Sequence, residues 1–410
     1  KLNVQRSENS VGGWKNETLM DIGKPSEKGN WQYVVYTQND DEGRLFLNGK
    51  LVAFNNKMFT MSETFPKEAP VYNWMGRAPF KGDSYLKGTR ISDVRMYDSA
   101  LTEKEIRELY NELELGDLSR HDFMYTGQSK NRRIYKIQEG EIVWKYDNAK
   151  GKGEISDAVL MNDGHILIAD QYGIAELDEQ GAEIWRSLAP KGTEIHTIQP
   201  IGKNHVVYVL NAKPAKVVVM KISNQKIVHE FVLPYDEKGS VHGQFRNARL
   251  TSKGTLLVSN MAMGFVAEYN HRGKELNRWE LFGPWSASEL PNGNILMVGR
   301  KGPVKEIKRD GTVVWEINAV DYGLTNPQKA YRLANGNTVI TNWFNEWNKK
   351  DVLQFNPSRA PLQMVEVTPD GYVAWQLSSW KGDRNLGPAT TFQLLDEPVA
   401  REKSRFGKFK

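Results

Sequence analysis

Hydrophobic and polar positions alternate along much of the first quarter of the chain, the period-two pattern of half-buried β-strands. Residues 31–37 (WQYVVYT) alternate, residues 39–43 are turn-like, and residues 44–52 (RLFLNGKLV) hold two more strands around Asn48-Gly49. An Asn-Gly pair between apolar runs indicates a tight hairpin, because both central residues of that turn need a positive φ. Residues 85–97 alternate again and predict a further strand.

The pattern changes to a helical period at residues 102–110 (TEKEIRELY). Thr102 and Glu105 have the spacing of a capping box, so a short helix is expected to begin there. With residues 88–97 (GTRISDVRMY) before it and the Asn-Gly hairpin upstream, this text resembles the laminin-G-like, concanavalin-A-like jelly roll. The resemblance covers about residues 28–112 and implies a β-sandwich domain at residues 1–115, incomplete or continued upstream.

Residues 118–398 are repetitive. A turn glycine is followed by a short strand ending in Trp, and a first strand ending in Leu precedes a Gly turn, at a period of roughly 40 residues. The turn-to-Trp copies are residues 140–144 (GEIVW), 181–185 (GAEIW), 311–315 (GTVVW) and 371–375 (GYVAW), with a looser copy at 273–279 and a degenerate one ending in Phe231.

Four strands at this period predict the blades of a β-propeller, and six blades can be placed. The first blade is split, because residues 121–146 supply three strands and residues 388–396 (PATTFQLLD) have the shape of a lone first strand. Adding that last strand to the first blade would close the ring and remove an open edge. The expected fold class is all-β, an N-terminal sandwich plus a six-bladed propeller. An unclosed array of hairpins is the alternative, and residues 399–410 are interpreted as a basic, frayed tail.

The repeat text of residues 290–296 (LPNGNIL) and 310–315 (DGTVVW) resembles pyrroloquinoline-quinone-like repeats and the arylsulfotransferases. This resemblance implies a propeller and an exported bacterial protein. It implies no particular activity. Quinoproteins of this type have eight blades and a metal site, and neither is evident in this sequence. The arylsulfotransferases use a central histidine and have a larger chain.

Composition narrows the function classes. The net charge is +5 over 410 residues, a weak field without the basic stripe of a nucleic-acid binder. The chain has no Cys, which excludes disulfides and thiolate chemistry, and no apolar run long enough to span a membrane. We expect no cofactor and no metal, and Asp40-Asp41-Glu42 is interpreted as a solvated turn. Attachment to a cell surface through residues upstream of Lys1 is left open.

The repeat alignment also predicts where a site would lie. In a propeller the innermost strands start at one face of the central channel, and the loops joining the second and third strands of each blade rise on that face. The innermost strands place Asp157, His196 and Tyr331 as candidate catalytic residues. The candidate substrate-binding residues are Tyr172, Arg246, Asn247, Trp285, Arg300, Lys329, Asn342, Trp343 and Trp347.

These side chains suit a polar ligand. Indole and phenol faces stack on sugar rings, amides hydrogen-bond hydroxyls, and Arg or Lys attracts a carboxylate or sulfate. Asp157 could serve as a general base with a raised pKa, or it could pair with Lys329 or Arg246 across the channel. His196 is either catalytic or a hydrogen-bonded structural residue.

The leading hypothesis is an exported carbohydrate-binding or carbohydrate-processing protein with its ligand in the central funnel. If it is an enzyme, it would be a glycoside hydrolase or polysaccharide lyase acting on a complex glycan, with anionic glycans included. The alternative is a non-catalytic protein-interaction scaffold, whose channel would be plugged with apolar side chains and whose rim would bind partners, whereas a ligand site needs a wet polar cavity. A sulfotransferase-like enzyme using a central histidine is the weaker alternative.

Overall fold

The computed structural model divides into two compact units, Lys1–Glu114 with Asn356–Arg359, and Leu115–Phe355 with Ala360–Lys410. The residues that it describes are 3–7, 17–21, 32–60, 91, 94–115, 118–127, 132–148, 153–344, 362–380 and 382–410. Among these residues, every helix is too short or too polar to cross a bilayer.

In the N-terminal unit, β1 (Asn3–Ser7) pairs with β2 (Glu17–Asp21), and β3 (Val34–Asn39), β4 (Glu42–Leu47) and β5 (Lys50–Asn55) form an antiparallel sheet. The predicted Asn-Gly turn joins β4 to β5, with φ values of 52° and 72°. Gly43 and Leu45, two residues apart on β4, are buried as the alternation requires. Phe46 is buried as well, at the point where the pairing register of β4 with β5 shifts.

Helix α2 (Glu103–Leu115) is longer than the expected 102–110, and the predicted capping box is confirmed. The Thr102 backbone N–H donates to Glu105 Oε2 at 2.7 Å, and the Glu105 N–H donates to Thr102 Oγ1 at 3.3 Å. The strand expected at residues 85–97 falls largely outside the described residues. Its described end, residues 94–97, is not a strand, and Val94 and Met96 there are exposed rather than packed on a sheet.

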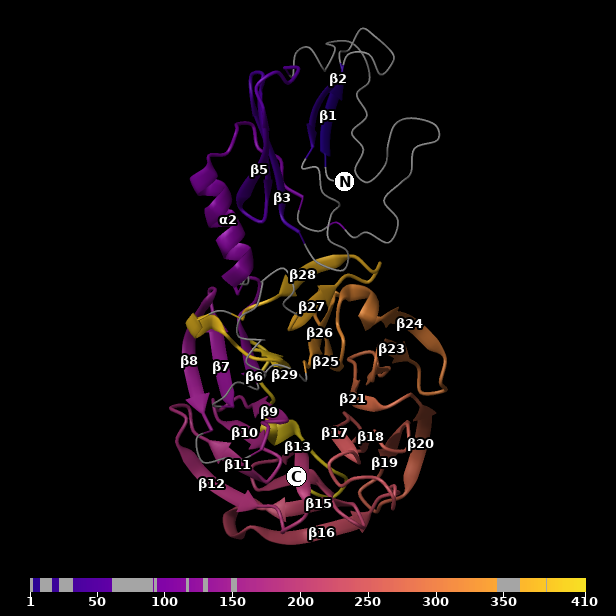
Figure 1. Cartoon of the computed structure of the whole chain (residues 1–410). Coiled ribbons are helices and arrows are strands. Elements are labelled where there is room, and N and C mark those ends of the chain that lie inside the picture. Colours follow the sequence, from indigo (N-terminus) through magenta and orange to yellow (C-terminus); the bar gives the residue numbers. More distant parts are fainter. Residues whose placement is uncertain are drawn as a thin grey trace. The chain divides into compact units, whose positions relative to one another are not determined.

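The described part of the second unit forms six four-stranded antiparallel sheets arranged as a propeller (Figure 1). Five of them are continuous in sequence, and each begins with its innermost strand. They are β9 (Asp157–Leu160), β10 (Ile166–Ala169), β11 (Gly173–Leu177) and β12 (Glu183–Leu188); β13 (Glu194–Ile201), β14 (His205–Asn211), β15 (Lys216–Lys221) and β16 (Lys226–Val232); β17 (Phe245–Leu250), β18 (Leu256–Asn260), β19 (Phe265–Tyr269) and β20 (Glu275–Glu280); β21 (Pro284–Glu289), β22 (Ile295–Gly299), β23 (Pro303–Ile307) and β24 (Val313–Asn318); and β25 (Pro327–Arg332), β26 (Thr338–Asn342), β27 (Met364–Val367) and β28 (Val373–Leu377).

The sixth sheet is the split blade that the sequence predicts. It consists of β29 (Ala389–Leu394), β6 (Phe123–Gly127), β7 (Arg133–Gln138) and β8 (Glu141–Asp147). Strand β29 pairs antiparallel with β6, from Ala389 opposite Gly127 to Leu394 opposite Phe123. The last strand therefore closes the ring, and neither β6 nor β29 is left as an open edge.

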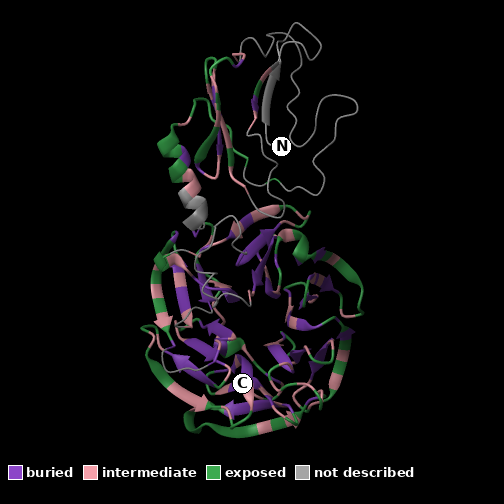
Figure 2. Cartoon of the chain, in the orientation of Figure 1, coloured by how far each residue is buried: buried purple, intermediate pink, exposed green. Residues whose placement is uncertain are grey.

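The blades pack through their middle strands, while their outermost strands alternate between exposed and half-buried positions (Figure 2). The recurring Trp residues lie between blades, as expected from their constant position. Trp279 Nε1 donates to the Arg309 carbonyl oxygen and Trp315 Nε1 to that of Pro369, in each case a turn of the following blade. Each indole thus buries apolar surface and still satisfies its N–H.

Residues 399–407 form a C-terminal strap across three successive blades. Val399 bridges to Met161, the Gly202 N–H donates to the Ser404 carbonyl oxygen, and the Gly407 N–H donates to that of Gly254.

This strap corrects the expectation of a frayed tail. Phe406 is fully buried in the core shared by β13–β16 and β17–β20. Arg401 forms ion pairs with Asp163 and Glu176 at 2.8 and 3.1 Å. The basic residues had suggested solvation, but an aromatic anchor and fixed carboxylate partners hold the segment in place.

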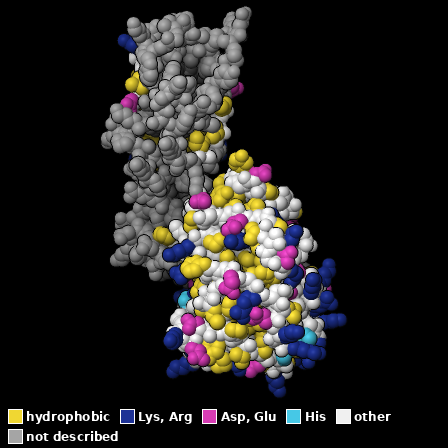
Figure 3. Space-filling model, turned by 90° about the vertical axis from the view of Figure 1, so that its right-hand side faces the viewer, with side chains coloured by type: hydrophobic (Ala, Val, Ile, Leu, Met, Phe, Trp, Pro, Cys, Tyr) yellow, Lys and Arg dark blue, Asp and Glu magenta, His cyan; other side chains and the backbone are white. Residues whose placement is uncertain are grey.

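On the face in Figure 3, acidic and basic side chains are interspersed over the propeller.

Candidate functional site

The starting ends of the innermost strands surround a narrow recess at the propeller axis. Its empty volume is about 270 Å³ including the open side, and it leaves room for about one water molecule. Residues of several blades line it: Glu154, Ser156, Arg246, Trp285, Gln328, Lys329 and Thr390.

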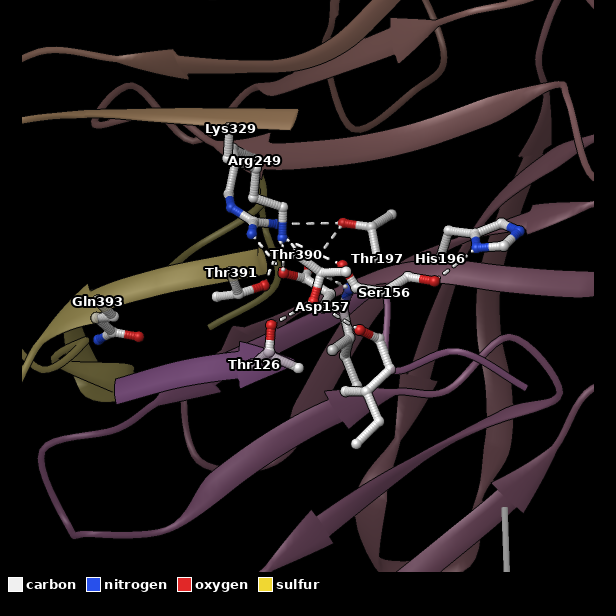
Figure 4. A network of polar contacts seen from close by, with 12 residues as sticks. Thr126, Ser156, Asp157, His196, Thr197, Arg249, Lys329, Thr390, Thr391 and Gln393 are labelled. Atoms are coloured by element: carbon white, nitrogen blue, oxygen red, sulfur yellow. Dashed lines mark hydrogen bonds and ion pairs between the residues drawn. The ribbon is translucent and has the colours of Figure 1, made fainter. Parts of the chain in front are cut away.

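Below the recess lies the hub, a buried polar network of Asp157, Thr197, Arg249, Lys329 and Thr391 (Figure 4). Arg249 binds the Asp157 carboxylate through both terminal nitrogens, at 2.6 and 2.8 Å, and Lys329 Nζ donates to Asp157 Oδ1 at 2.7 Å. Thr197 Oγ1 donates to Asp157 Oδ2, and Lys329 Nζ also donates to Thr391 Oγ1. The five residues come from β9, β13, β17, β25 and β29, so the hub ties five blades together at the axis.

Burial and the charges within the hub shift the pKa values of its ionisable side chains. Burial alone would raise the pKa of the Asp157 carboxyl, but Arg249 and Lys329 hold it well below its usual range. Burial lowers the pKa of the Lys329 ammonium to about 8, against the opposing pull of Asp157. Tyr331 is half-buried, its surroundings raise the pKa of its phenol well above the usual range, and its oxygen accepts from the Phe392 N–H.

At the rim of the recess, Glu194, His196 and His242 form a second group, called the rim cluster here. Glu194 Oε2 is 2.9 Å from His196 Nε2 and 2.7 Å from His242 Nδ1. The other nitrogen of His196, Nδ1, is 2.8 Å from Ser156 Oγ. The ligating atoms of the three residues all lie within 4.8 Å of one another, a spacing at which they could hold a metal ion.

Arg246 connects the rim cluster with the recess. Its NH1 donates to Glu154 Oε1 at 2.8 Å and lies 3.4 Å from His196 Nδ1, and its guanidinium carbon lies 4.8 Å from the centre of the Trp285 ring. Burial, chiefly, lowers the pKa of Arg246, although Glu154 and Glu194 oppose the shift.

Three buried hydrogen-bond donors of the recess residues find no acceptor among the described residues: Arg246 Nε, Trp285 Nε1 and Gln328 Nε2. A buried polar group without a partner costs about 1–3 kcal/mol, and three of them share this one small space. All three are donors, and Lys329 lines the same space, with its Nζ bonded to the Ser156 carbonyl oxygen, Asp157 Oδ1 and Thr391 Oγ1.

Several of the expected site residues are brought together. Asp157 and Lys329 meet in the hub, Arg246, Trp285 and Lys329 line the recess, and His196 lies at the rim. Of the two roles considered for Asp157, the structure shows the ion pair. Its partners are Lys329, as predicted, and Arg249 in place of Arg246. Its lowered pKa is the opposite of the raised value that a general base there would need.

The remaining expected residues do not line the recess. Tyr172 and Arg300 are exposed. Asn342 is buried but structural, since its amide accepts from the Asn326 N–H and donates to the Leu362 carbonyl oxygen. Buried Asn247 and half-buried Trp343 lie outside the lining as well. Trp347 lies outside the described residues.

Sequence reasoning missed two carboxylates and gave one histidine little weight. Glu154 and Glu194 stand two residues before Ser156 and His196. Residues two apart on a strand share a face, and this spacing was the signal that could have found both carboxylates. His242 lies in a loop, and its contact with Glu194 shows its place in the cluster.

Comparisons with known proteins agree with the two-part architecture. Residues 4–107 match the family model of the concanavalin A-like lectin/glucanases superfamily, laminin G type. A search of curated proteins finds no match.

Solved structures with similar folds include a protein of unknown function from Bacteroides caccae, at 24% identity and a TM-score of 0.54, covering 66% of this chain and 97% of that one. A catalytically inactive virginiamycin B lyase from Staphylococcus aureus with quinupristin has 12% identity and a TM-score of 0.44, covering 63% and 86%. BamB from Moraxella catarrhalis has 14% identity and a TM-score of 0.33, covering 52% and 62%. These likenesses concern the propeller fold alone.

Proposed function

We propose that this chain is an exported binding protein whose propeller captures the carboxylate of an acidic carbohydrate in the axial recess. The observation that carries the proposal is the set of three buried donors that find no acceptor among the described residues, in a recess that Lys329 also lines. A carboxylate is an acceptor-only group with two oxygens, and it would satisfy such donors while its charge meets that of Lys329.

The size of the recess restricts what enters. Room for about one water admits a carboxylate with small side-chain shifts but not a sugar ring. The ring would remain outside, where the indole of Trp285 is the group suited to sugars. The lectin-like match of residues 4–107 supports a carbohydrate over other carboxylates.

Binding is favoured over catalysis by the state of the expected catalytic residues. Asp157 is committed to two cations, and Tyr331 is half-buried with a raised phenol pKa. Both ring nitrogens of His196 are engaged, by Glu194 and by Ser156, which also disfavours a sulfotransferase that uses this histidine as its nucleophile.

A protein-interaction scaffold remains the second candidate, because the recess at the axis is narrow. The hub is polar, however, whereas a scaffold propeller was expected to plug its channel with apolar side chains. The two candidates differ in the recess. A scaffold that uses only its rim gains nothing from unsatisfied donors at the axis.

Calorimetric titration of the full chain with oligogalacturonate and with its methyl ester tests the proposal. We expect binding of the acid form and at least tenfold weaker binding of the ester. Gln328→Leu should weaken acid binding about tenfold while leaving the free protein equally or more stable, because it removes a donor that has no partner.

Gln393→Leu is the matched control on a neighbouring inner strand. The Gln393 amide donates to the carbonyl oxygens of Leu160 and Glu397, so its loss should lower stability without changing affinity. Equal affinity for acid and ester, or an unchanged affinity in Gln328→Leu, would refute the anion site. If no oligogalacturonate binds, sialylated and other acidic oligosaccharides must also fail before the carbohydrate class is abandoned.

A further inference from the structure

We propose that the rim cluster, Glu194, His196 and His242, is a binding site for a divalent transition-metal ion, with Zn²⁺ as the preferred occupant. This inference is independent of the proposed carbohydrate function. It rests on three observations: the convergence of the ligand atoms, the hydrogen bonds that hold them, and the lack of a fixed counter-cation at Glu194.

The ligand atoms converge from two separate segments of the chain. Glu194 and His196 lie two residues apart on β13, so their side chains leave the strand on the same side. His242 comes from the loop before β17 and approaches the same carboxylate oxygen. The two imidazole rings are 5.2 Å apart, edge to face. Separations of 2.7 and 2.9 Å from the shared oxygen are close to those between neighbouring ligands of one metal ion, so a small opening would admit the ion.

Each ligand on β13 is held by an outer partner. His196 Nδ1 is bonded to Ser156 Oγ at 2.8 Å, with Glu154 Oε1 at 3.3 Å, which leaves Nε2 directed at the cluster. Glu194 Oε1 accepts from Gln171 Nε2 at 2.9 Å, which leaves Oε2 for the ion. Metal-binding histidines and carboxylates are typically oriented by such second hydrogen bonds.

Two other histidine–carboxylate pairs in the described chain show what a purely structural pair looks like. Glu176, bonded to His165, also pairs with Arg401, and Glu366, bonded to His121, also pairs with Arg120.

Glu194 differs from both. Among the described residues its ion-pair partners are the two histidines alone, without a Lys or Arg within 4.0 Å. This half-buried carboxylate, shared by two imidazoles, thus has no Lys or Arg to supply a permanent positive charge, and a divalent cation would supply it.

The donor set indicates the kind of metal. Two imidazole nitrogens and one carboxylate oxygen favour Zn²⁺ and its neighbours over Ca²⁺ and Mg²⁺, which prefer oxygen ligands. Three protein ligands leave at least one position open. The His242 side chain is 46% exposed, so the ion could be reached from solvent.

The test is a titration of untagged, chelator-treated full-length protein with Zn²⁺ and with Co²⁺. Calorimetry should give one Zn²⁺ per chain, and Co²⁺ should give a visible absorption band of nitrogen and oxygen ligation. The chain has no Cys, so thiolate bands cannot interfere. His242→Ala should weaken Zn²⁺ binding by at least about 100-fold, the upper end of what loss of an outer partner costs.

Two further variants separate the site from general surface binding. Gln171→Asn shortens the outer partner of Glu194 and should weaken Zn²⁺ binding by about tenfold; Asn also suits the positive φ of 70° at that position. His165→Ala removes a histidine of a structural pair and should leave the affinity unchanged.

A wild-type chain that binds neither ion at millimolar concentration overturns the proposal. It is also overturned if His242→Ala and His165→Ala bind Zn²⁺ alike, which would indicate adventitious binding. Because His242 lies on the surface, its variant is expected to keep the wild-type melting temperature in the presence of chelator. Should that variant misfold, Gln171→Asn and the wild-type Co²⁺ spectrum decide the question.

Discussion

Replacing Asp157 with Asn tests whether the hub holds the propeller together at its axis. Asp157 is fully buried and is the one anion facing Arg249 and Lys329 within the hub. An ion pair with charge centres about 4 Å apart is worth about 4 kcal/mol at an effective dielectric constant of about 20. Asn keeps the shape and part of the hydrogen bonding but leaves two buried cations uncompensated.

We expect Asp157→Asn to lower the free energy of unfolding by about 3–5 kcal/mol, the usual cost of breaking a buried pair. Deprotonation of Lys329, whose pKa is already lowered to about 8, limits the loss. Lys329→Met is the matched control. It leaves Asp157 neutralised by Arg249, so its cost should stay below about 2 kcal/mol despite the lost bonds to Ser156 and Thr391.

Urea titration of the full chain provides the measurement, with hydrogen exchange of peptides from β9, β17 and β25 to assign the transition to the propeller. The pH dependence is a second readout. In Asp157→Asn, native Lys329 should lose its proton below pH 8, whereas the unfolded side chain keeps it to about pH 10.4. The unfolded state then binds more protons over that interval, so the stability of the variant should rise with pH. Equal losses in Asp157→Asn and Lys329→Met would refute the reasoning.

Three further predictions concern other parts of the chain. The affinity for oligogalacturonate should fall by up to about tenfold per pH unit above pH 8, as Lys329 loses its proton, and a flat calorimetric profile from pH 7 to 9 would exclude Lys329 from binding. Phe406→Ala should cost the propeller about 3–5 kcal/mol in urea titration, because the ring is fully buried, whereas the half-buried Phe409 should cost clearly less when replaced by Ala. Thr102→Ala should destabilise the start of α2 by about 1 kcal/mol, seen as faster amide exchange in its first turn, and Thr102→Ser should not.

The fold could be predicted from the sequence because short local patterns mark each repeat. The turn glycines and the blade-ending Trp residues mark each blade, and the apolar strand at residues 389–394 has no local partner, which pointed to ring closure. The C-terminal strap was not predicted. Its anchoring depends on Phe406 packing into a core formed by residues 201–269, more than 130 positions earlier, and no local sequence pattern indicates that contact.

The candidate site was predictable in position but not in chemistry. The alignment of the repeats predicted that Asp157, Arg246 and Lys329 lie near the propeller axis, because that placement depends only on strand alternation and on the number of blades. Which cation neutralises Asp157 depends on how far each side chain reaches. Arg249, two residues after Asn247 on β17, binds the Asp157 carboxylate with both terminal nitrogens. Likewise, the convergence of His242 on Glu194 depends on the path of a loop, which sequence periodicity does not describe.

The pairing of β29 with β6 has a consequence for how the chain is made. Thr390 bonds to Thr126 across 264 residues, a stretch that a ribosome needs roughly 15–50 seconds to add. Throughout that time β6 lacks its partner on the axial side and presents an open edge. A chain truncated before residue 389 would lack β29 and leave the ring of six sheets unclosed.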